Sequence, residues 1–398
     1  VTHHPLGTDG SGAFTRDRLT FLAYGMALTF GYAVAALGPA MPLLREDLGI
    51  SRTVGGLHFT VLAAGSVLTG LVVGRIVPVW GRRRLFWTGG AGVAAGSLLI
   101  GAGWHPTITM AGCLVVGASG SATVITVQAS LSDRHSSHRP VALTEANMSM
   151  SVGTVIPALV IGASVAVGAG WRPAFVAPAA LWITLLLLLR SEVFPAAAAT
   201  GQPGHRRALP GAYWWFWAAF IPAVGAEWSV GAWGADYLVS VAGTKEGAAS
   251  FLMSGFFGAM VLGRFLGGRV ARRTKPFPLL LGTTTLGLGG AFLLWGSGSR
   301  PLVVCGLFVT GLGISMLFPM LLSLAIGIVS DRPDVAAARI SIAAGGSVIV
   351  APLTLGALAD QIGIRGAFGL VPGLLVFVVL FAALGRRASV GQEPSVPV

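Results

Sequence analysis

Charged residues are scarce in this chain of 398 residues: they make up 10%, whereas an ordinary soluble domain has about a quarter. Acidic residues are the rarer kind, since 14 Asp and Glu stand beside 26 Lys and Arg. With 54% hydrophobic residues and a mean hydropathy of +0.79, the composition excludes an ordinary soluble domain. We therefore expect an integral membrane protein that is surrounded by a lipid bilayer.

Cysteine is also rare, and the sequence patterns of common enzymes are missing. The two cysteines, Cys113 and Cys305, both fall in apolar stretches, which argues against a metal cluster and against an extracellular disulfide framework. The chain contains no phosphate-binding GxxxxGKS/T, no HExxH, and no nucleophile elbow with Ser, His and Asp. We expect no enzyme activity, no cofactor and no metal site.

Apolar stretches of about twenty residues recur along the whole chain, and each is long enough to cross a bilayer as a helix. A transmembrane barrel is disfavoured, because its strands would show short alternating patterns instead. The sequence predicts an all-α membrane protein with twelve transmembrane helices, at residues 19–44, 54–77, 85–102, 107–131, 143–167, 173–189, 213–241, 248–270, 277–295, 302–328, 335–359 and 366–384.

One long polar connection, rich in Ala, Pro, Gly and basic residues, separates the sixth span from the seventh. It reads as a linker between two halves of six spans each. The predicted organisation is an N-terminal tail, a six-helix bundle, a linker, a second six-helix bundle and a C-terminal tail, at residues 1–18, 19–189, 190–212, 213–385 and 386–398.

Basic residues are distributed unequally over this map. A cytoplasmic N-terminus satisfies the positive-inside rule, and it predicts an inner-membrane protein with both termini in the cytoplasm. The net charge of +12 sits in short loops rather than on a soluble face, which argues against a nucleic-acid partner. Of the 26 Lys and Arg, 20 then face the cytoplasm, and the others are Arg45, Arg52, Arg172, Lys245, Arg300 and Arg365.

The two halves repeat each other in sequence. VGRIV at 73–77 corresponds to LGRFL at 262–266, and a basic loop follows each. The fourth spans of the two halves end in LSDR and VSDR, the fifth spans carry Pro157 and Pro352, and WRPAF and IRGAF follow. Four correspondences in the same order indicate a duplicated six-helix unit.

Twelve spans, a central loop and basic loops after the second and eighth spans resemble the major facilitator superfamily. The resemblance implies two pseudo-symmetric six-helix bundles that rock about a central cavity, lined mainly by the first, fourth, seventh and tenth spans. GAEWSVGAWGADYL, GRFLGGRVARR and GLGISMLFPMLLSLA also resemble the fucose:proton symporter branch. The chain departs from that branch in having no acidic residue in its first and fourth spans, and Pro78 replaces the aspartate of the family's loop pattern.

A carboxylate, Glu227, lies deep inside the seventh span. No Lys or Arg is expected at its depth, because Arg75 and Arg264 are placed near cytoplasmic ends. A low-dielectric site favours the neutral form of an unpaired carboxyl, so Glu227 is predicted to carry the coupling proton or to contact the substrate. The alternative is a permanently protonated Glu227 that is hydrogen-bonded to a backbone carbonyl at a glycine-rich bend.

Aromatic and amide side chains of the inner spans are candidates for a cavity that takes up an apolar or amphipathic solute. Ordinary helix packing is the alternative for each aromatic residue. The predicted cavity residues are Tyr24, Tyr32, Gln128, Asn147, Trp228, Trp233 and Phe318.

Charged residues at matching cytoplasmic ends of the two halves are candidates for a gate. Asp133 and Asp331 lie beside basic loops, so carboxylate–guanidinium pairs are expected to latch the outward-open state and to break when the cytoplasmic side opens. Solvated loop charges are the alternative, since an exposed pair contributes only about 0–1 kcal/mol. The predicted gating residues are Arg75, Arg82, Asp133, Arg264, Arg272 and Asp331.

These features favour a secondary active transporter that moves a small organic solute by alternating access, coupled to protons through Glu227. Its expected partners are a small-molecule substrate, protons and the bilayer, and we expect it to function as a monomer. A proton-coupled sugar or metabolite uptake permease and a non-transporting membrane sensor are the alternatives, because a fold does not fix a function.

Overall fold

The computed structural model describes residues 14–195, 209–329 and 333–390, and every regular element in these ranges is a helix. Two short 3₁₀ turns, Ser136–His138 and Arg172–Val176, lead into the fifth and sixth helices. The helices of the first half are α1 (Arg18–Leu48), α2 (Arg52–Trp80), α3 (Arg82–Ala102), α4 (Pro106–Arg134), α5 (Arg139–Ala166) and α6 (Ala177–Leu189).

In the second half, α10 and α11 together occupy the span predicted at 302–328, because the helix is interrupted at Ser315 and Met316. Gly363 leaves the helical conformation with a φ of 79°, and α12 continues beyond this kink. The helices are α7 (Gly211–Ser240), α8 (Glu246–Ala271), α9 (Pro276–Gly296), α10 (Arg300–Ile314), α11 (Leu317–Ile328), α12 (Pro333–Ala367) and α13 (Leu370–Val390).

Eleven helical stretches of the described chain are long and apolar enough to cross a bilayer. The twelfth span is α7, which has 30 residues but contains more Trp, Tyr and Gly than Val, Ile and Leu. It lies at the centre of the molecule, where α1, α8, α12 and α13 pack against it. A helix that contacts protein more than lipid does not need aliphatic side chains, so the prediction of twelve helices is confirmed.

Glycine allows helices to pack closely in the same way in both halves. A Cβ atom at Gly96 of α3 would lie 2.8 Å from the carbonyl oxygen of Gly112 in α4. In the second half, a Cβ atom at Gly306 of α10 would lie 2.9 Å from the carbonyl oxygen of Gly290 in α9. The packing therefore repeats as the sequence does, and it confirms two pseudo-symmetric bundles.

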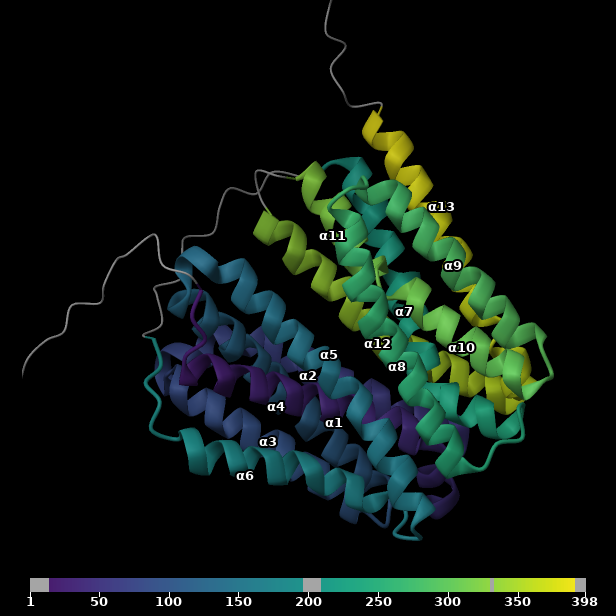
Figure 1. Cartoon of the computed structure of the whole chain (residues 1–398), viewed down its shortest axis with the longest axis horizontal. Coiled ribbons are helices and arrows are strands. Elements are labelled where there is room, and N and C mark those ends of the chain that lie inside the picture. Colours follow the sequence, from purple (N-terminus) through teal and green to yellow (C-terminus); the bar gives the residue numbers. More distant parts are fainter. Residues whose placement is uncertain (1–13, 196–208, 330–332, 391–398) are drawn as a thin grey trace, which may run out of the picture.

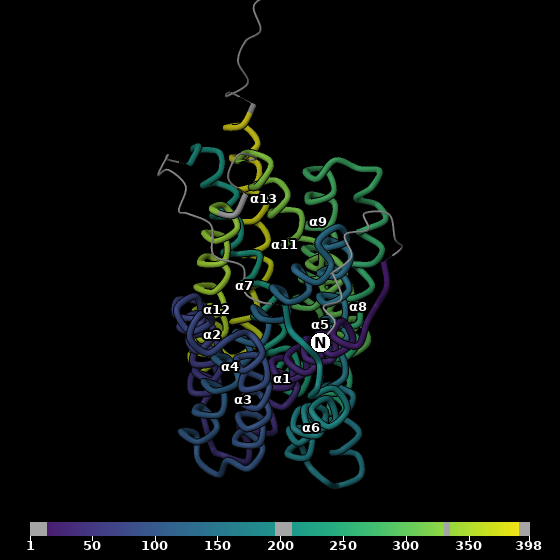
Figure 2. The backbone as a smooth tube through the Cα atoms, turned by 90° about the vertical axis from the view of Figure 1, so that its left-hand side faces the viewer, coloured from purple at the N-terminus to yellow at the C-terminus, as the bar shows by residue number. Residues whose placement is uncertain are grey.

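The two bundles meet mainly along three pairs of helices, α2 with α12, α5 with α8, and α1 with α7, and α1 also contacts α8. In Figure 1 the bundles form a V that opens toward the side where α1 begins, and Figure 2 shows them side by side in a second view. We call the end of the molecule at which α1 begins the basic end, because Arg16 and Arg82 to Arg84 lie there. The opposite end, at which α1 ends, is the distal end.

Polar contacts between the bundles extend from the distal end only as far as the middle of the helices. The Ser250 hydroxyl of α8 donates to the carbonyl oxygen of Pro39 in α1 at 2.7 Å, near the distal end. Within the ranges that the structure describes, the polar contact nearest the basic end joins Arg264 of α8 to Ser151 of α5. The molecule is therefore closed at its distal end, and its halves separate toward the basic end.

The connection between the halves is described in part: α6 ends at Leu189 and α7 begins at Gly211. Residues 196–208 of the predicted linker lie outside the described ranges. The boundaries of the tails, bundles and linker stay predictions.

Candidate functional site

A cavity of about 100 Å³ lies between the two halves, near the middle of the helices. It is formed by α1, α2 and α5 of the first half and by α7 and α8 of the second. The fourth and tenth spans, which the family resemblance placed at the cavity, supply no lining residue, because α4 packs behind α2 and α10 packs behind α8. Its lining residues are Val34, Ala35, Gly38, Phe59, Thr154, Glu227, Trp228, Gly231, Ala232, Phe256, Phe257, Met260, Val261 and Arg264.

Glu227 lines this cavity, but the expectation that it has no basic neighbour is wrong. Its Oε1 atom lies 3.6 Å from Nη2 of Arg264, and the two side chains are 27% and 34% exposed. Counted from the distal ends of their helices at about 1.5 Å per residue, Glu227 lies about 20 Å deep and Arg264 about 27 Å deep. An arginine side chain is long enough to span that difference in depth, which counting residues along each helix does not reveal.

Arg264 also connects the two halves. Its Nη1 atom donates a hydrogen bond to the Ser151 hydroxyl of α5, at 2.8 Å. The same guanidinium therefore contacts a carboxylate of its own half and a hydroxyl of the other half. A change in the charge of Glu227 alters the surroundings of a group that bridges the bundles.

Among the predicted cavity residues, Trp228 lines the cavity beside Glu227. Tyr24 and Tyr32 of α1 do not, because their hydroxyls are used inside the first half. The Tyr24 hydroxyl donates to Glu145 at 2.9 Å, and the buried Tyr32 hydroxyl donates to the carbonyl oxygen of Ala174 at 2.8 Å. In this conformation both tyrosines contact other residues of the first half instead of the cavity.

Trp233 is fully buried and also lies outside the cavity. Its indole N–H donates to the carbonyl oxygen of Pro352 at 2.8 Å, and its ring lies 6.4 Å from that of Phe59 in the other half. Trp233 therefore closes the contact between the halves on the distal side of the cavity.

The other three predicted cavity residues do not line the cavity either. Phe318 of α11 is 37% exposed and its ring packs edge-on against Phe220, with ring centroids 5.2 Å apart. Gln128 of α4 and Asn147 of α5 are exposed, and both lie closer to the basic end than the cavity does. Their predicted role in binding solute is not supported by contact with the cavity in this conformation.

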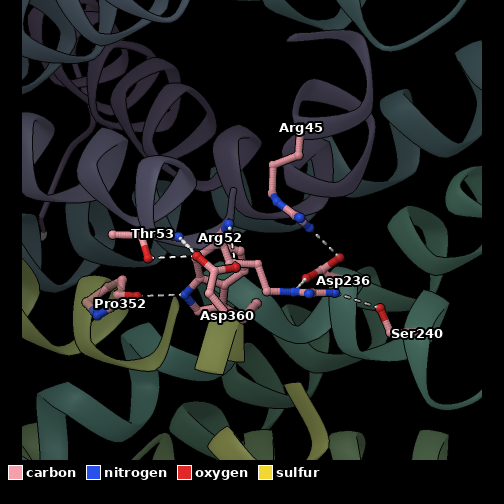
Figure 3. Close-up of polar contacts among 8 residues, drawn as sticks. Arg45, Arg52, Thr53, Asp236, Ser240, Pro352 and Asp360 are labelled. Carbon is pink, nitrogen blue, oxygen red and sulfur yellow. Dashed lines mark hydrogen bonds and ion pairs between the residues drawn. The ribbon is translucent and has the colours of Figure 1, made fainter. Parts of the chain in front are cut away.

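A second polar cluster, which the sequence analysis missed, lies at the distal end (Figure 3). Asp236 of α7 is 4% exposed and lies between two arginines of the first half: its carboxylate is 3.0 Å from Nη1 of Arg45 and 2.6 Å from Nε of Arg52. Asp360 of α12 accepts hydrogen bonds from the backbone N–H groups of Arg52 and Thr53, at 3.0 and 2.7 Å. We call these five residues the distal cluster.

The distal cluster joins the beginning of α2 to both α7 and α12. Asp360 lies at the N-terminus of α2, where unpaired N–H groups and the helix dipole favour a carboxylate. The sequence places Arg45 and Arg52 among the few basic residues on the non-cytoplasmic side. It gives no sign that they contact Asp236. The cluster therefore bridges the two halves at the distal end.

The predicted gating residues at the basic end are found in part. Nη1 of Arg82 lies 2.8 Å from the Asp133 carboxylate, but this pair joins α3 to α4 within one half, so it does not bridge the bundles. Arg75 and Arg272 are exposed, and Asp331 lies outside the described residues. The Arg82–Asp133 pair is formed although the halves separate at this end, whereas such pairs were expected to break when this side opens.

Within the ranges described, no three His, Cys, Asp or Glu side chains lie close enough together to hold a metal ion. The cavity itself offers a carboxylate, a guanidinium and apolar walls.

Two six-helix halves around a cavity with one acid and one base define a membrane transport protein. Residues 23–332 and 216–397 match the model of the Major Facilitator Superfamily, so the matches extend over nearly the whole chain. The chain belongs to this family.

Several known proteins are similar to this chain. An uncharacterized MFS-type transporter of Yersinia pestis is 25% identical over 374 residues, which cover 92% of this chain and 95% of that protein. A glucose/galactose transporter of Brucella abortus is 26% identical over 226 residues, which cover 52% of either chain. The crystal structure of a bacterial homologue of the human lysosomal transporter Spinster, inward-facing and unoccupied, covers 96% of this chain and all of its own with a TM-score of 0.75. At 13% identity, this last likeness shows the fold alone.

Proposed function

We propose that this protein is a secondary active transporter that carries a small organic solute by alternating access. The cavity lies between two bundles that touch at the distal end and separate toward the basic end. A transporter of this kind binds its solute at the repeat interface and rocks one bundle against the other. The distal cluster breaks and re-forms in this cycle, because it joins α2 of one half to α7 and α12 of the other.

We further propose that Glu227 couples solute movement to protons. The observation that carries this proposal is the 3.6 Å approach of its carboxylate to Arg264, inside the cavity and at the hydrogen bond to Ser151. Ionised Glu227 attracts the guanidinium, and protonated Glu227 does not. Binding or loss of one proton therefore changes the balance of forces on a residue that bridges the halves.

The orientation follows from the distribution of charge. We propose that the basic end faces the cytoplasm of a bacterial inner membrane, as the positive-inside rule requires, with both termini on that side. The conformation described here then faces inward.

A sugar permease is the main alternative, since one relative is a glucose/galactose transporter. Sugar hydroxyls are recognised by several polar side chains, whereas Thr154, Glu227 and Arg264 are the cavity's polar residues and the other eleven lining residues are apolar, glycine or tryptophan. The lining favours an amphipathic solute.

The proposal is tested by flux in proteoliposomes that contain a pH-sensitive dye and face an imposed pH gradient. A panel of hexoses, nucleosides and amphipathic acids is added in turn. The wild type is expected to move protons with at least one solute class, and the direction of the flux distinguishes uptake from efflux. Glu227→Gln should lose the pH dependence of solute flux, because an amide cannot take up a proton.

Glu192→Gln is the matched control: this carboxylate lies 3.1 Å from Arg18 at the basic end and outside the cavity. It should keep wild-type flux and pH dependence. Solute flux through Glu227→Gln with an unchanged rate and pH profile would contradict the coupling role. Solute binding without any flux in the wild type would favour the non-transporting sensor.

A further inference from the structure

The cavity contains a base that cannot be neutralised and an acid that can. An arginine side chain is not deprotonated in proteins, whereas a carboxyl group can take up a proton. Together they give an empty cavity no net charge when Glu227 is ionised. This asymmetry decides which charge a bound solute can carry.

A cationic solute would leave the cavity with one positive charge, because Arg264 cannot release its proton to compensate. An anionic solute would leave one negative charge, but protonation of Glu227 removes it. Uncompensated charge in a site of low dielectric is costly. The pair therefore accepts an anion together with a proton and disfavours a cation.

The guanidinium of Arg264 has hydrogen-bond donors to offer. In the described part of the chain it donates one hydrogen bond, from Nη1 to Ser151, and at 3.6 Å its contact with Glu227 is too long for a second. A guanidinium presents five N–H donors in a planar fork that matches a carboxylate. Arg264 lines the cavity, and its side chain is a third exposed.

The rest of the cavity is suited to an apolar body. Phe59 of the first half and Trp228, Phe256, Phe257 and Met260 of the second line it. Aromatic and thioether side chains contact an apolar ligand well but offer it few hydrogen bonds. A solute that fits both features has one anionic group and an apolar chain or ring.

We propose that the cavity binds an amphipathic organic monoanion, whose charged group takes the place of the Glu227 carboxylate at Arg264 while Glu227 accepts a proton. This inference rests on the proposed function and names its substrate class. One proton and one anion cross together, so the transport step carries no net charge. Its rate should follow the pH gradient and should not respond to the membrane potential.

Three probes with one carbon skeleton test the charge preference: 3-phenylpropanoate, 3-phenylpropanamide and 3-phenylpropylamine. Binding is measured by calorimetry on the protein in lipid nanodiscs, with empty nanodiscs subtracted, and proton uptake is followed with an indicator dye in weak buffer. The anion is expected to bind about tenfold or more tightly than the amide or the amine. It should take up close to one proton per anion where Glu227 is ionised.

Variants separate the two roles. Glu227→Gln should bind the anion at least as well as the wild type, without proton uptake. Arg264→Gln should lose about tenfold or more in affinity for the anion. The affinity of Arg264→Lys should lie between those of Arg264→Gln and the wild type, since lysine keeps the positive charge but not the planar fork of N–H donors. Arg269→Gln is the control, because Arg269 is on the same helix but exposed and outside the cavity.

The proposal is overturned if the amine or the amide binds as tightly as the anion, if Arg264→Gln keeps wild-type affinity for the anion, or if neither 3-phenylpropanoate nor its longer homologues bind. These results differ from failure of the proposed function. A pH-driven flux of a neutral or cationic solute that depends on Glu227 would reject the anion and keep the transporter. Binding of the anion without flux would keep the proposed solute class and reject the transporter.

Discussion

Gly38 of α1 lies where the two halves come closest, facing Gly231 of α7. A Cβ atom at Gly38 would overlap the carbonyl oxygen of Gly231, whereas a Cβ atom at Gly231 would meet nothing nearer than Phe257 at 3.9 Å. The two glycines face each other across the same contact, yet only one of them has no room for a side chain.

This difference gives a matched pair of substitutions. Gly38→Ala should destabilise the distal-closed protein by about 1–3 kcal/mol through overpacking. Gly231→Ala should be neutral or stabilising by up to about 1 kcal/mol, since alanine favours a helix over glycine. Thermal unfolding in detergent measures both, and a Gly38→Ala melting temperature at or above that of the wild type would contradict the packing argument.

At the level of single residues, the sequence singled out Glu227, which lines the cavity, but it did not reveal the neighbouring Arg264. A carboxylate inside an apolar span is visible in the sequence, because its cost in lipid is a property of that residue alone. Its contact with Arg264 depends on the relative depth and rotation of α7 and α8 and on the length of a side chain. Those quantities arise from packing, so the sequence did not reveal Arg264 as the neighbour of Glu227.

Among the helices, α1 has a clear polar start. Asp17 is its N-cap: the carboxylate accepts hydrogen bonds from the backbone N–H and the hydroxyl of Thr20, at 2.9 and 2.6 Å, and lies 2.6 Å from Nε of Arg134 in α4. Burial alone raises the pKa of the Asp17 carboxyl, but the hydrogen bonds from Thr20 and Arg134 outweigh burial and hold the pKa below its usual value.

Asp17→Ala should therefore lower stability by about 1 kcal/mol at pH 7, the usual effect of losing an N-cap. Because the folded-state pKa is depressed, the contribution of Asp17 is complete above the unfolded-state pKa of about 3.9 and is lost as the pH falls through the folded-state value. The difference in melting temperature between variant and wild type should shrink accordingly below about pH 4.

Asp17→Ser provides the control, because serine keeps a capping oxygen but loses the contact with Arg134. Its melting temperature at pH 7 should lie between those of Asp17→Ala and the wild type. If Asp17→Ala lowers the melting temperature equally at pH 7 and at pH 3, the ionised carboxylate is not the origin of the effect.

Helices were predictable in number and nearly so in their bounds. The span predicted at 213–241 is α7, Gly211–Ser240, because apolar length and flanking polar residues are local properties. The end of the span predicted at 335–359 was placed too early, because the helix continues to the kink at Gly363. Asp360 lies in this extension and accepts hydrogen bonds from the start of α2, a long-range contact that the sequence does not reveal.

For the whole molecule, the sequence repeat predicted two bundles, and the structure repeats even its glycine contacts. Corresponding residues nevertheless do different things: Arg75 and Arg264 occupy matching positions in the repeat, but Arg75 is exposed and Arg264 lines the cavity. Duplication fixes the architecture of each half. The site arises where the halves meet, and there the symmetry of the sequence gives no information.

The distal cluster should decide which end of the molecule is open. Asp236 is nearly buried between Arg45 and Arg52 of the other half, so the closed distal end gains from both ion pairs. When the distal end opens, water solvates the same groups. Removing the Asp236 charge leaves two like charges facing each other in the closed form and costs little in the open one.

Asp236→Asn should therefore shift the population toward the distal-open state. We would measure this with a cysteine at Ala35, which lines the cavity, in a chain that carries Cys113→Ala and Cys305→Ala, using a thiol reagent that does not cross the membrane. Added from the distal side, the reagent should label Asp236→Asn about tenfold faster or more, since about 1.4 kcal/mol changes an equilibrium tenfold.

Asp47→Asn is the matched control for this experiment. Asp47 is also a distal carboxylate of α1's last turn, but its partners, the indole N–H of Trp171 at 2.7 Å and Arg172 at 3.4 Å, belong to its own half. Opening the distal end does not separate them, so labelling should stay at the wild-type rate. Equal labelling of Asp236→Asn and Asp47→Asn would show that closure rests on the apolar contacts at Gly38 and Trp233 instead of on charge.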